Sequence, residues 1–424
     1  MPTSIKKTPS TLTVLVASFV GTTVEFFDFY IFATAAVLVF PTVFFPGADP
    51  TLATLKSFMT FALAFLTRPL GSMLFGHFGD RIGRKATLVA ALLTMGISTF
   101  AIGLLPGFNQ IGMWAPILLA LCRIGQGIGL GGEWGGAVLL AIEYAPPKHR
   151  AKYGLFPQLG APVGFVLSGL AFYLLTNNLD THQLLDFGWR IPFLLSAALV
   201  LLGLYVRLRL AETPVFENSR SKFLEKNVPF VEIATVHLKA LAVGIAVALA
   251  NFVLFYLMAV FVLNWGTTQF AISKPLLISL QLLGMVFFAV GILIGSWFSE
   301  RHRKRTLILG NACIVLYGLA FSNLFVADPT SIGLTLCSGL FLMGLIYGPV
   351  GTTLGELFPT AVRYTGSSLA FSMAGILGAS VAPMLGTYLG KTYGLQAVGL
   401  YLAGSALLSL AGSLALNNQV PDEL

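Results

Sequence analysis

The sequence predicts an all-α membrane protein with 12 transmembrane helices in two six-helix bundles. Its composition, its long apolar runs and a repeat between its two halves predict this fold class. Of the 424 residues, 56% are hydrophobic and only 10% are charged, and the mean hydropathy is +0.85. Soluble domains carry about 25% charged residues, so this chain has too few charges to cover a water-exposed surface. A soluble protein is excluded.

The apolar runs are long enough to cross a bilayer. A hydrocarbon layer of about 30 Å needs about 20 apolar residues in a helix, and a lipid-exposed backbone must satisfy its own hydrogen bonds. The first run follows Lys6 and Lys7, is too long for a signal-peptide core and has no small-residue cleavage site, so we expect a retained span. The predicted spans are 12–40, 53–76, 86–105, 113–141, 153–175, 190–210, 240–264, 275–298, 307–326, 331–355, 365–389 and 395–416.

The basic residues are distributed unevenly between the two sides of this topology. Twelve spans put both termini on one side, and 19 of the 25 Lys and Arg residues fall on that side. Only Arg190, Lys274 and Lys391 fall on the other side. The positive-inside rule therefore predicts cytoplasmic termini in a bacterial-type inner (plasma) membrane. The net charge of +8 is explained by this topology, so no nucleic-acid partner is expected.

The two halves of the chain share two sequence patterns. The spacing E-x-x-P-x-x-x-R occurs at 143–150 and again at 356–363, which is 213 residues later. The loop 79–85 is likewise echoed by 299–305. Both echoes fall on the cytoplasmic side, which predicts a parallel repeat about an axis along the membrane normal. The predicted organisation is an N-terminal bundle 1–210, a cytoplasmic linker 211–238 and a C-terminal bundle 239–424.

Signatures of enzymes and of cofactor-binding proteins are missing from the sequence. The five histidines are scattered, with none at metal-ligand spacing, and no P-loop pattern is present. Gly127–Gly132 formally fits G-x-G-x-x-G, but it lies inside an apolar helix-length run and not at a strand-to-helix turn. Its glycines predict close packing of two membrane helices. We therefore expect no metal, no cofactor and no enzymatic activity.

Several motifs resemble the major facilitator superfamily. Gly76–Lys85 resembles the signature G-x-x-x-D-[RK]-x-G-R-[RK] of the loop between its second and third helices, and Arg123–Gly127 resembles R-x-x-Q-G of its fourth helix. The stretches 24–30, 131–136, 212–216 and 356–360 resemble the metabolite:proton symporter branch, which includes shikimate, citrate, 2-oxoglutarate and proline/betaine transporters. The resemblance implies the major facilitator fold and proton-coupled symport. The second-half loop departs from the pattern because it has lost its glycines.

The first span contains two acidic residues, Glu25 and Asp28. At i and i+3 they share one face of the helix, and charged groups at this depth usually face a polar cavity. Neighbouring negative charge and partial desolvation favour the neutral form of a carboxyl group. One or both are therefore candidates to carry a coupling proton. The alternative is a structural ion pair with Arg123 or another cation.

The fourth span places Arg123, Gln126 and Glu133 within about 80° of one another on a helical wheel. Arg123 is a candidate to bind a substrate carboxylate with its forked guanidinium, or it neutralises one of the carboxylates. Glu133 is a candidate either for a proton relay or for buried pairing. In the second span, Arg68 is expected to pair structurally.

Other polar and aromatic residues complete the predicted site. Candidate substrate contacts are Phe29, Tyr30, Gln158, Asn251 and Tyr256, with Phe29-Tyr30 echoed by Phe255-Tyr256. The resemblance implies a cytoplasmic gate in which the acid of the loop caps a neighbouring helix and salt bridges stabilise the outward-facing state. The candidate gating residues are Gly76, Asp80, Arg81, Gly83, Arg84, Lys85, Glu143, Arg150, Glu300, Arg301, Glu356 and Arg363.

The expected function is proton-coupled symport of a small organic acid or related polar metabolite by alternating access, with the site at mid-membrane. A symporter of zwitterions of the proline or betaine type is the first alternative. An uncoupled channel would need no buried titratable group, and a transporter-like sensor should carry an extra soluble domain. The expected partners are the small-molecule substrate, protons and the lipid bilayer, without an obligate protein partner.

Overall fold

The computed structural model describes residues 11–47, 49–208 and 229–416, and these residues contain helices but no strand. Residues 212–216, with most of the predicted linker, lie outside the described residues. The elements of the first half are α1 (Thr11–Leu38), α2 (Phe40–Val43), α3 (Pro50–Arg81), α4 (Arg84–Leu104), α5 (Phe108–Ile111), α6 (Trp114–Glu143), η1 (Pro147–His149), α7 (Arg150–Asn178), α8 (Thr181–Gln183), η2 (Leu184–Gly188) and α9 (Arg190–Leu208). Those of the second half are α11 (Pro229–Thr235), α12 (Leu238–Tyr256), η3 (Leu257–Phe261), α13 (Val262–Thr268), α14 (Lys274–Leu324), α15 (Pro329–Glu356), α16 (Arg363–Gly375), η4 (Ile376–Ser380), α17 (Ala382–Tyr393) and α18 (Leu395–Leu414).

The described helices cross the membrane twelve times, as the sequence predicts. Eleven helical segments are long and apolar enough to span, and one of them, α14, has 51 residues. Its backbone leaves the helical region at His302 (φ −138°, ψ 47°), so α14 is two spans joined at a kink. The kink falls in the polar segment 299–305, between the predicted spans 275–298 and 307–326. Every other predicted span matches one helical segment to within a few residues.

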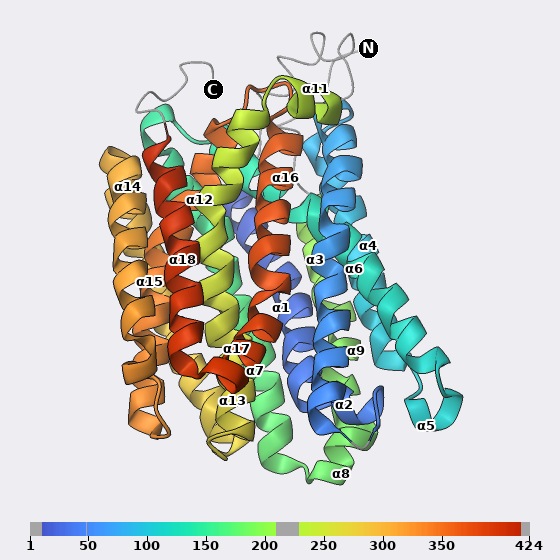
Figure 1. The fold of residues 1–424 in the computed structure, drawn as a ribbon. Coiled ribbons are helices and arrows are strands. Elements are labelled where there is room, and N and C mark those ends of the chain that lie inside the picture. Colours follow the sequence, from blue (N-terminus) through green and yellow to red (C-terminus); the bar gives the residue numbers. More distant parts are fainter. Residues whose placement is uncertain (1–10, 48, 209–228, 417–424) are drawn as a thin grey trace, which may run out of the picture.

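The short helices mark the two ends of the bundle (Figure 1). Helix α11 lies at one end, which the distribution of basic residues identifies as cytoplasmic. Helices α2, α5 and α8 lie at the opposite end. The described part of the chain begins with α1 and ends with α18, and consecutive long helices alternate in direction between these two ends.

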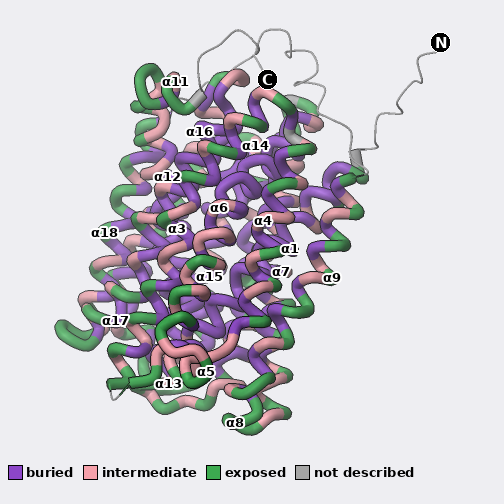
Figure 2. Tube along the Cα trace, turned by 90° about the vertical axis from the view of Figure 1, so that its right-hand side faces the viewer, coloured by how far each residue is buried: buried purple, intermediate pink, exposed green. Residues whose placement is uncertain are grey.

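The outer faces of the helices are exposed (Figure 2), and many of their exposed side chains are large and apolar. Along α3, Leu66, Leu70 and Leu74 follow one another every four residues, and each is about half exposed (51%, 54% and 48%). A stripe with this spacing lies on one side of a helix. Exposed leucines in a row suit a lipid-facing surface, because lipid chains are as apolar as the leucines.

The glycines of α6 allow it to approach α3 closely, as the sequence predicts. A Cβ atom on Gly127 would fall on the backbone oxygen of Ala64, and one on Gly131 would fall on that of Arg68. Backbone contact of this kind is available only to glycine. The close approach brings Arg68 of α3 and Glu133 of α6 into the interior of the N-terminal bundle.

Candidate functional site

A small enclosed cavity lies between the two bundles. Its volume is about 20 Å³, which is enough for a water molecule and too small for a metabolite. Its wall is mostly aromatic and draws on α1, α3, α6 and α7 of the first half and on α12, α14, α15 and α16 of the second. The lining residues are Glu25, Phe26, Phe29, Tyr30, Arg68, Leu130, Ala161, Asn251, Phe252, Phe255, Tyr256, Phe288, Met343, Tyr347 and Phe371.

A larger cleft of about 720 Å³ opens at the cytoplasmic end. Its lining begins at Val236 and includes Lys239 of α12, residues 299–305 at the α14 kink and Leu416. All of these residues belong to the second half of the chain. A substrate that passes between the bundles would not cross this cleft, so the central cavity is the candidate substrate site.

The N-terminal side of the cavity carries an ion pair. Glu25 of α1 and Arg68 of α3 are buried, and the Glu25 Oε1 atom lies 3.6 Å from an Nη atom of Arg68. The Arg68 guanidinium also lies over the ring of Phe371 of α16, 5.1 Å from its centroid. These two are the only charged side chains in the described lining of the cavity. The Glu25 carboxylate and its counter-ion therefore face the place where a substrate would bind.

The C-terminal side of the cavity carries neutral polar groups. The amide nitrogen and oxygen of Asn251, on α12, have no hydrogen-bond partner within the described structure, and neither has the hydroxyl of Tyr347, on α15. Both side chains are buried, with 1% and 4% of their surface exposed. Buried polar groups normally have a partner, so this pair marks a place for a ligand to hydrogen-bond.

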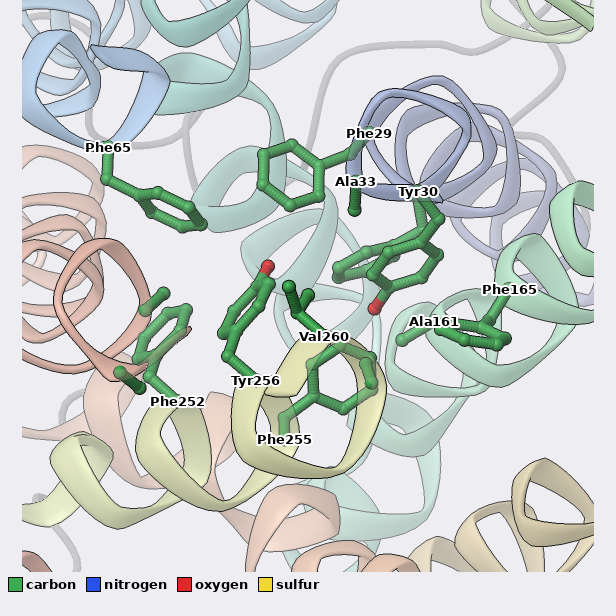
Figure 3. Close-up of a cluster of buried hydrophobic side chains, with 14 of the residues drawn as sticks. Phe29, Tyr30, Ala33, Phe65, Ala161, Phe165, Phe252, Phe255, Tyr256 and Val260 are labelled. Atoms are coloured by element: carbon green, nitrogen blue, oxygen red, sulfur yellow. The ribbon is translucent and has the colours of Figure 1, made fainter. Parts of the chain in front are cut away.

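Aromatic rings from both bundles close the cavity (Figure 3). Phe29 and Tyr30 of α1 face Phe255 and Tyr256 of α12. The ring centroids of Phe29 and Tyr256 are 6.2 Å apart, and those of Tyr30 and Phe255 are 5.3 Å apart. The two aromatic pairs, which the sequence predicts to be related by the internal repeat, therefore contact one another. Four of the predicted contact residues, Phe29, Tyr30, Asn251 and Tyr256, thus line one cavity.

Arg123 lies outside the lining of this cavity. Its guanidinium carbon lies 4.6, 4.0 and 5.0 Å from the ring centroids of Phe29, Phe32 and Phe61. The guanidinium also donates to the Gln126 side-chain oxygen at 2.9 Å and to the Phe61 carbonyl at 3.4 Å. No carboxylate of the described residues lies within ion-pair distance of Arg123. Arg123 packs against Phe29, a residue of the cavity wall, and its fully buried charge rests on aromatic faces and neutral acceptors.

Asp28 and Gln126 belong to a buried region between α1, α4, α6 and α9. The Gln126 amide nitrogen donates to Thr99 Oγ1 at 2.7 Å, so both ends of this amide are used within the protein. The Asp28 carboxyl, which is fully buried, faces the hydroxyls of Thr99 and Ser196. Asp28 and Glu25 therefore point to different surroundings although they are three residues apart.

Glu133 forms a buried ion pair with Arg207 of α9. Both oxygens of the carboxylate accept from the guanidinium, one of them at 2.7 Å from Nη1. Arg207 also donates to the Leu88 carbonyl at 2.8 Å. Of the two roles predicted for Glu133, buried pairing is the one that this geometry displays. The partner, Arg207, stands in the last turn of α9 and is one of the 19 basic residues that the sequence places on the cytoplasmic side.

The cytoplasmic floor of the cavity joins the two bundles. The ring of Trp134, on α6, stacks on Phe371 of α16 with centroids 3.6 Å apart. The Trp134 indole donates to the Gln158 side-chain oxygen at 3.0 Å, and the Gln158 amide donates to the Tyr347 carbonyl at 2.6 Å. Gln158 thus holds the bundles together beneath the cavity and does not line it.

Two carboxylates tie the bundles together nearer the cytoplasm. Asp80, at the end of α3, accepts from the backbone N–H and the hydroxyl of Thr365 at 3.2 and 2.8 Å. Glu300, at the α14 kink, accepts from the backbone N–H of Lys152 at 3.0 Å and lies 3.3 Å from His149 Nδ1. Thr365 and Lys152 are both the third residue of a helix, α16 and α7. Each half therefore caps a helix of the other half, as the resemblance implies for the first loop.

The lysines of the two loops act in a parallel way within their own halves. Lys85 donates to the carbonyl of Leu208 and Lys304 to that of Leu416, both at 2.7 Å. These carbonyls lie at or just after the ends of the sixth and twelfth spans. Lysine side chains at such positions satisfy the last carbonyls of a helix. The internal repeat predicted from sequence thus extends to individual hydrogen bonds.

The remaining candidate gating residues lie around these contacts. Glu356 forms an ion pair with Arg303, and Arg363 donates to the Phe358 carbonyl at 3.2 Å. Gly83 has a φ of +132°, which only glycine adopts easily. Gly76 packs so closely on Thr365 that a Cβ atom would collide with it. Glu143 and Arg150 are buried, Arg81 is half-buried and Arg301 is exposed, and the side chain of Arg84 lies outside the described part of the chain.

Sequence reasoning missed four residues of the site. Pairing of Arg68 is predicted and is present, but its place on the cavity wall is not predicted, and neither are Tyr347, Trp134 and Phe371 as residues of the site. The spacing of Tyr347 one residue before Gly348, in a glycine-rich run that repeats that of α6, is a signal that could have found it. No metal is suggested, since the described residues contain no group of three His, Cys, Asp or Glu side chains that could hold one.

Twelve crossings, two repeated halves and an enclosed site at their interface define a secondary transporter, which is not an enzyme. The chain belongs to the Major Facilitator Superfamily, whose family profile matches residues 18–383. It is 50% identical over 408 residues to the inner membrane metabolite transport protein YhjE of Escherichia coli K12, covering 95% of this chain and 93% of that protein. It is a multi-pass protein of the inner membrane.

Other relatives have named substrates. The shikimate transporter of E. coli K12 is 34% identical, over 95% of this chain and 93% of its own. The proline/betaine transporter of Salmonella typhimurium LT2 is also 34% identical, over 88% of this chain and 77% of its own. Among solved structures, the proton:xylose symporter XylE bound to 6-bromo-6-deoxy-D-glucose superposes with a TM-score of 0.76 at 19% identity, covering 97% of this chain and 96% of that one. This last likeness concerns the fold.

Proposed function

We propose that the protein is a proton-coupled symporter of a small organic acid, which it carries by alternating access through the central cavity. The observation that carries this proposal is the Glu25–Arg68 ion pair on the cavity wall. A carboxylate that faces the substrate site and neutralises a cation there can couple a proton to a substrate anion. The cytoplasmic caps made by Asp80 and Glu300 are assigned to the gate.

The coupling follows from the charge balance of the cavity. In the empty site, Glu25 and Arg68 neutralise one another. A proton on Glu25 alone would leave Arg68 as an uncompensated buried cation, and breaking a buried ion pair in this way costs about 3–5 kcal/mol. A substrate carboxylate without the proton would add an uncompensated anion. Proton and carboxylate together keep the site neutral, so each favours the binding of the other.

Glu25 is the group assigned to carry the proton, because Asp28 faces Thr99 and Ser196 and not the cavity. Alternating access requires the floor and the cytoplasmic caps to open after the proton and the substrate have bound from outside. Glu133 is assigned to buried pairing with Arg207. Arg123 and Gln126 are assigned to holding α1, α3 and α4 against α6.

Uptake by proteoliposomes with an alkaline interior tests this function. The compounds to screen are shikimate, 2-oxoglutarate, citrate, proline and betaine, each with and without a protonophore. Accumulation that the protonophore abolishes is expected for a carboxylate. If the protonophore leaves the accumulation of every compound unchanged, the proposal of proton coupling is wrong.

The variants Glu25→Gln and Asp28→Asn test which carboxyl group carries the coupling proton. Both remove a buried carboxyl three residues apart on α1 and are therefore matched. Glu25→Gln should abolish accumulation driven by the pH gradient and retain counterflow exchange, because glutamine imitates a permanently protonated Glu25. Asp28→Asn should retain accumulation. The reverse result would assign the coupling proton to Asp28.

A further inference from the structure

The cavity presents different chemistry on its two sides. Arg68 and Glu25 are on the N-terminal bundle, whereas the unsatisfied amide of Asn251 and the unsatisfied hydroxyl of Tyr347 are on the C-terminal bundle. Between them lie aromatic rings and Met343. A ligand that satisfies all of these groups has a negative charge at one end, an apolar body and a neutral hydrogen-bonding end.

We propose that the substrate is a monocarboxylate whose apolar or ring-shaped body carries a hydroxyl or similar neutral group at the far end. This proposal rests on the proposed function, since it uses the same cavity and the same Arg68. The carboxylate binds the guanidinium of Arg68 when Glu25 holds the proton. The hydroxyl group bonds to Asn251 and Tyr347.

The charges of the cavity argue against dicarboxylates and tricarboxylates. Arg68 is the one cation in the described lining, and Arg123 is not among the lining residues. A second carboxylate would have to lie against aromatic rings with no cation to neutralise it. An ionised carboxylate without a partner is among the most costly groups to bury.

The polar groups of the C-terminal side argue against quaternary ammonium compounds. The faces of Tyr30, Tyr256 and Phe252 could hold such a cation. A trimethylammonium group has no hydrogen to donate and no lone pair to accept with, however. It would leave the amide of Asn251 and the hydroxyl of Tyr347 without partners in a dry site, which is unfavourable.

The same arrangement explains how binding of the substrate would favour the closed state. A ligand bound at one end to α3 and at the other to α12 and α15 makes contacts with both bundles. A compound that lacks the far hydroxyl makes only apolar contacts with the C-terminal bundle. Because a ligand shifts a conformational equilibrium only through its differential affinity for the two states, the far group is what favours the closed state.

Calorimetric binding to the full-length protein in lipid nanodiscs tests the substrate class. The probes are cyclohexanecarboxylate, 3-hydroxycyclohexanecarboxylate, cyclohexane-1,3-dicarboxylate and glycine betaine. The hydroxylated monocarboxylate should bind about tenfold more tightly than its parent, as expected for hydrogen bonds to otherwise unsatisfied groups. The dicarboxylate and glycine betaine should bind at least about a hundredfold more weakly. Equal or tighter binding of either, or no binding of any probe, would overturn the proposal.

The double variant Asn251→Ala/Tyr347→Phe locates the far end of the ligand. It should bind the hydroxylated compound and its parent equally, and it should bind the parent as the natural protein does, which also shows that it is folded. Arg68→Lys should weaken the binding of both compounds. A preference for the hydroxyl that survives in the double variant would contradict the assignment.

The two proposals fail separately. Binding to nanodiscs needs no proton gradient, so a hydroxylated monocarboxylate that binds selectively but is not accumulated by a pH gradient would refute the coupling and leave the substrate class standing. Gradient-driven accumulation of citrate or betaine would refute the substrate class and leave the coupling standing.

Discussion

At the scale of single residues, Arg68 and Arg123 differ in what surrounds them. Both are buried arginines of the N-terminal bundle, with 4% and 0% of their surface exposed. Arg68 has a carboxylate beside it and a cavity in front of it, whereas Arg123 is enclosed by three phenylalanine rings and the amide of Gln126. The first arrangement allows exchange of one anion for another. The second allows the guanidinium no new partner without unpacking the rings.

Arg123→Lys and Arg68→Lys should therefore separate stability from substrate affinity. Lysine keeps the charge but loses the planar fork and its stacking. Arg123→Lys should lower the free energy of unfolding by about 1–3 kcal/mol and leave KM within about twofold. Arg68→Lys should raise KM by about tenfold or more, since a bidentate carboxylate contact is lost. Thermal unfolding in nanodiscs and initial rates of uptake measure both quantities. A raised KM for Arg123→Lys at unchanged stability would indicate that Arg123 binds the substrate after all.

The sequence predicts residue types at this site better than it predicts their directions. Glu25, Tyr30, Asn251 and Tyr256 line the cavity because polar or aromatic residues in a span tend to face the interior. The same rule cannot tell the cavity from a buried region within one bundle. Arg123 satisfies it equally well, and only the packing of its guanidinium on Phe29, Phe32 and Phe61 shows that it does not line the cavity.

At the scale of helices, the proposed cytoplasmic gate consists of two helix caps exchanged between the bundles. A carboxylate that accepts from the third residue of a helix satisfies a backbone N–H that has no partner inside the helix, and it also compensates the positive end of the helix dipole. Asp80 does this for α16 and Glu300 for α7. Opening of the proposed gate would remove both carboxylates from their helices together.

Asp80→Asn and Glu300→Gln should each shift the protein towards an inward-open state. Hydrogen bonds to charged groups contribute about 1.5–3 kcal/mol, so each change should raise the open population by about tenfold or more. Spin labels at Lys148 and Arg305, both exposed on the cytoplasmic side, should report a larger fraction of long distances in a cysteine-free background.

The matched control for this experiment is Asp328→Asn. Asp328 caps α15 by accepting from the N–H of Ser331 at 2.8 Å, and both residues belong to the C-terminal bundle. Its loss should lower stability without changing the distance between the labels. An unchanged distance distribution in Asp80→Asn and Glu300→Gln would remove these residues from the gate.

The boundaries of helices are the part of the fold that the sequence predicts best. Long apolar runs end at polar loops, which fixes the spans to within a few residues. The sequence does not show that Asp80 lies within helix α3, because the glycine-rich segment 76–83 is typical of a loop. It also does not show the π-helical turns η3 and η4, whose extra residue follows from packing between helices that are distant in sequence.

At the scale of the whole molecule, the two halves are chemically unequal although their folds are repeated. The cavity takes its charged pair from the first half and neutral polar groups from the second. The repeat supplies two bundles that can rock against one another, and the unequal residues supply a direction to the bound ligand. The parallel repeat was predicted from a few spaced residues. The division of charge between the halves needed the positions of Arg68 and Tyr347.

Transport of a monocarboxylate should be electrically neutral. One proton on Glu25 enters with one carboxylate on Arg68, so the loaded and the empty cavity carry the same charge. In proteoliposomes, a pH gradient should drive accumulation, while a potential set by potassium and valinomycin at equal pH should not. Uptake that follows the potential would mean that the proton and the carboxylate do not enter in equal numbers.

The small volume of the central cavity has a consequence for the cell's energy supply. Hydrogen ions cross membranes along continuous chains of water, and a space of about 20 Å³ holds about one molecule of water. Aromatic rings from both bundles line this space and leave little room for such a chain. A carrier at rest in this conformation should not leak protons, so a cell could keep many copies in an energised membrane without dissipating its proton gradient.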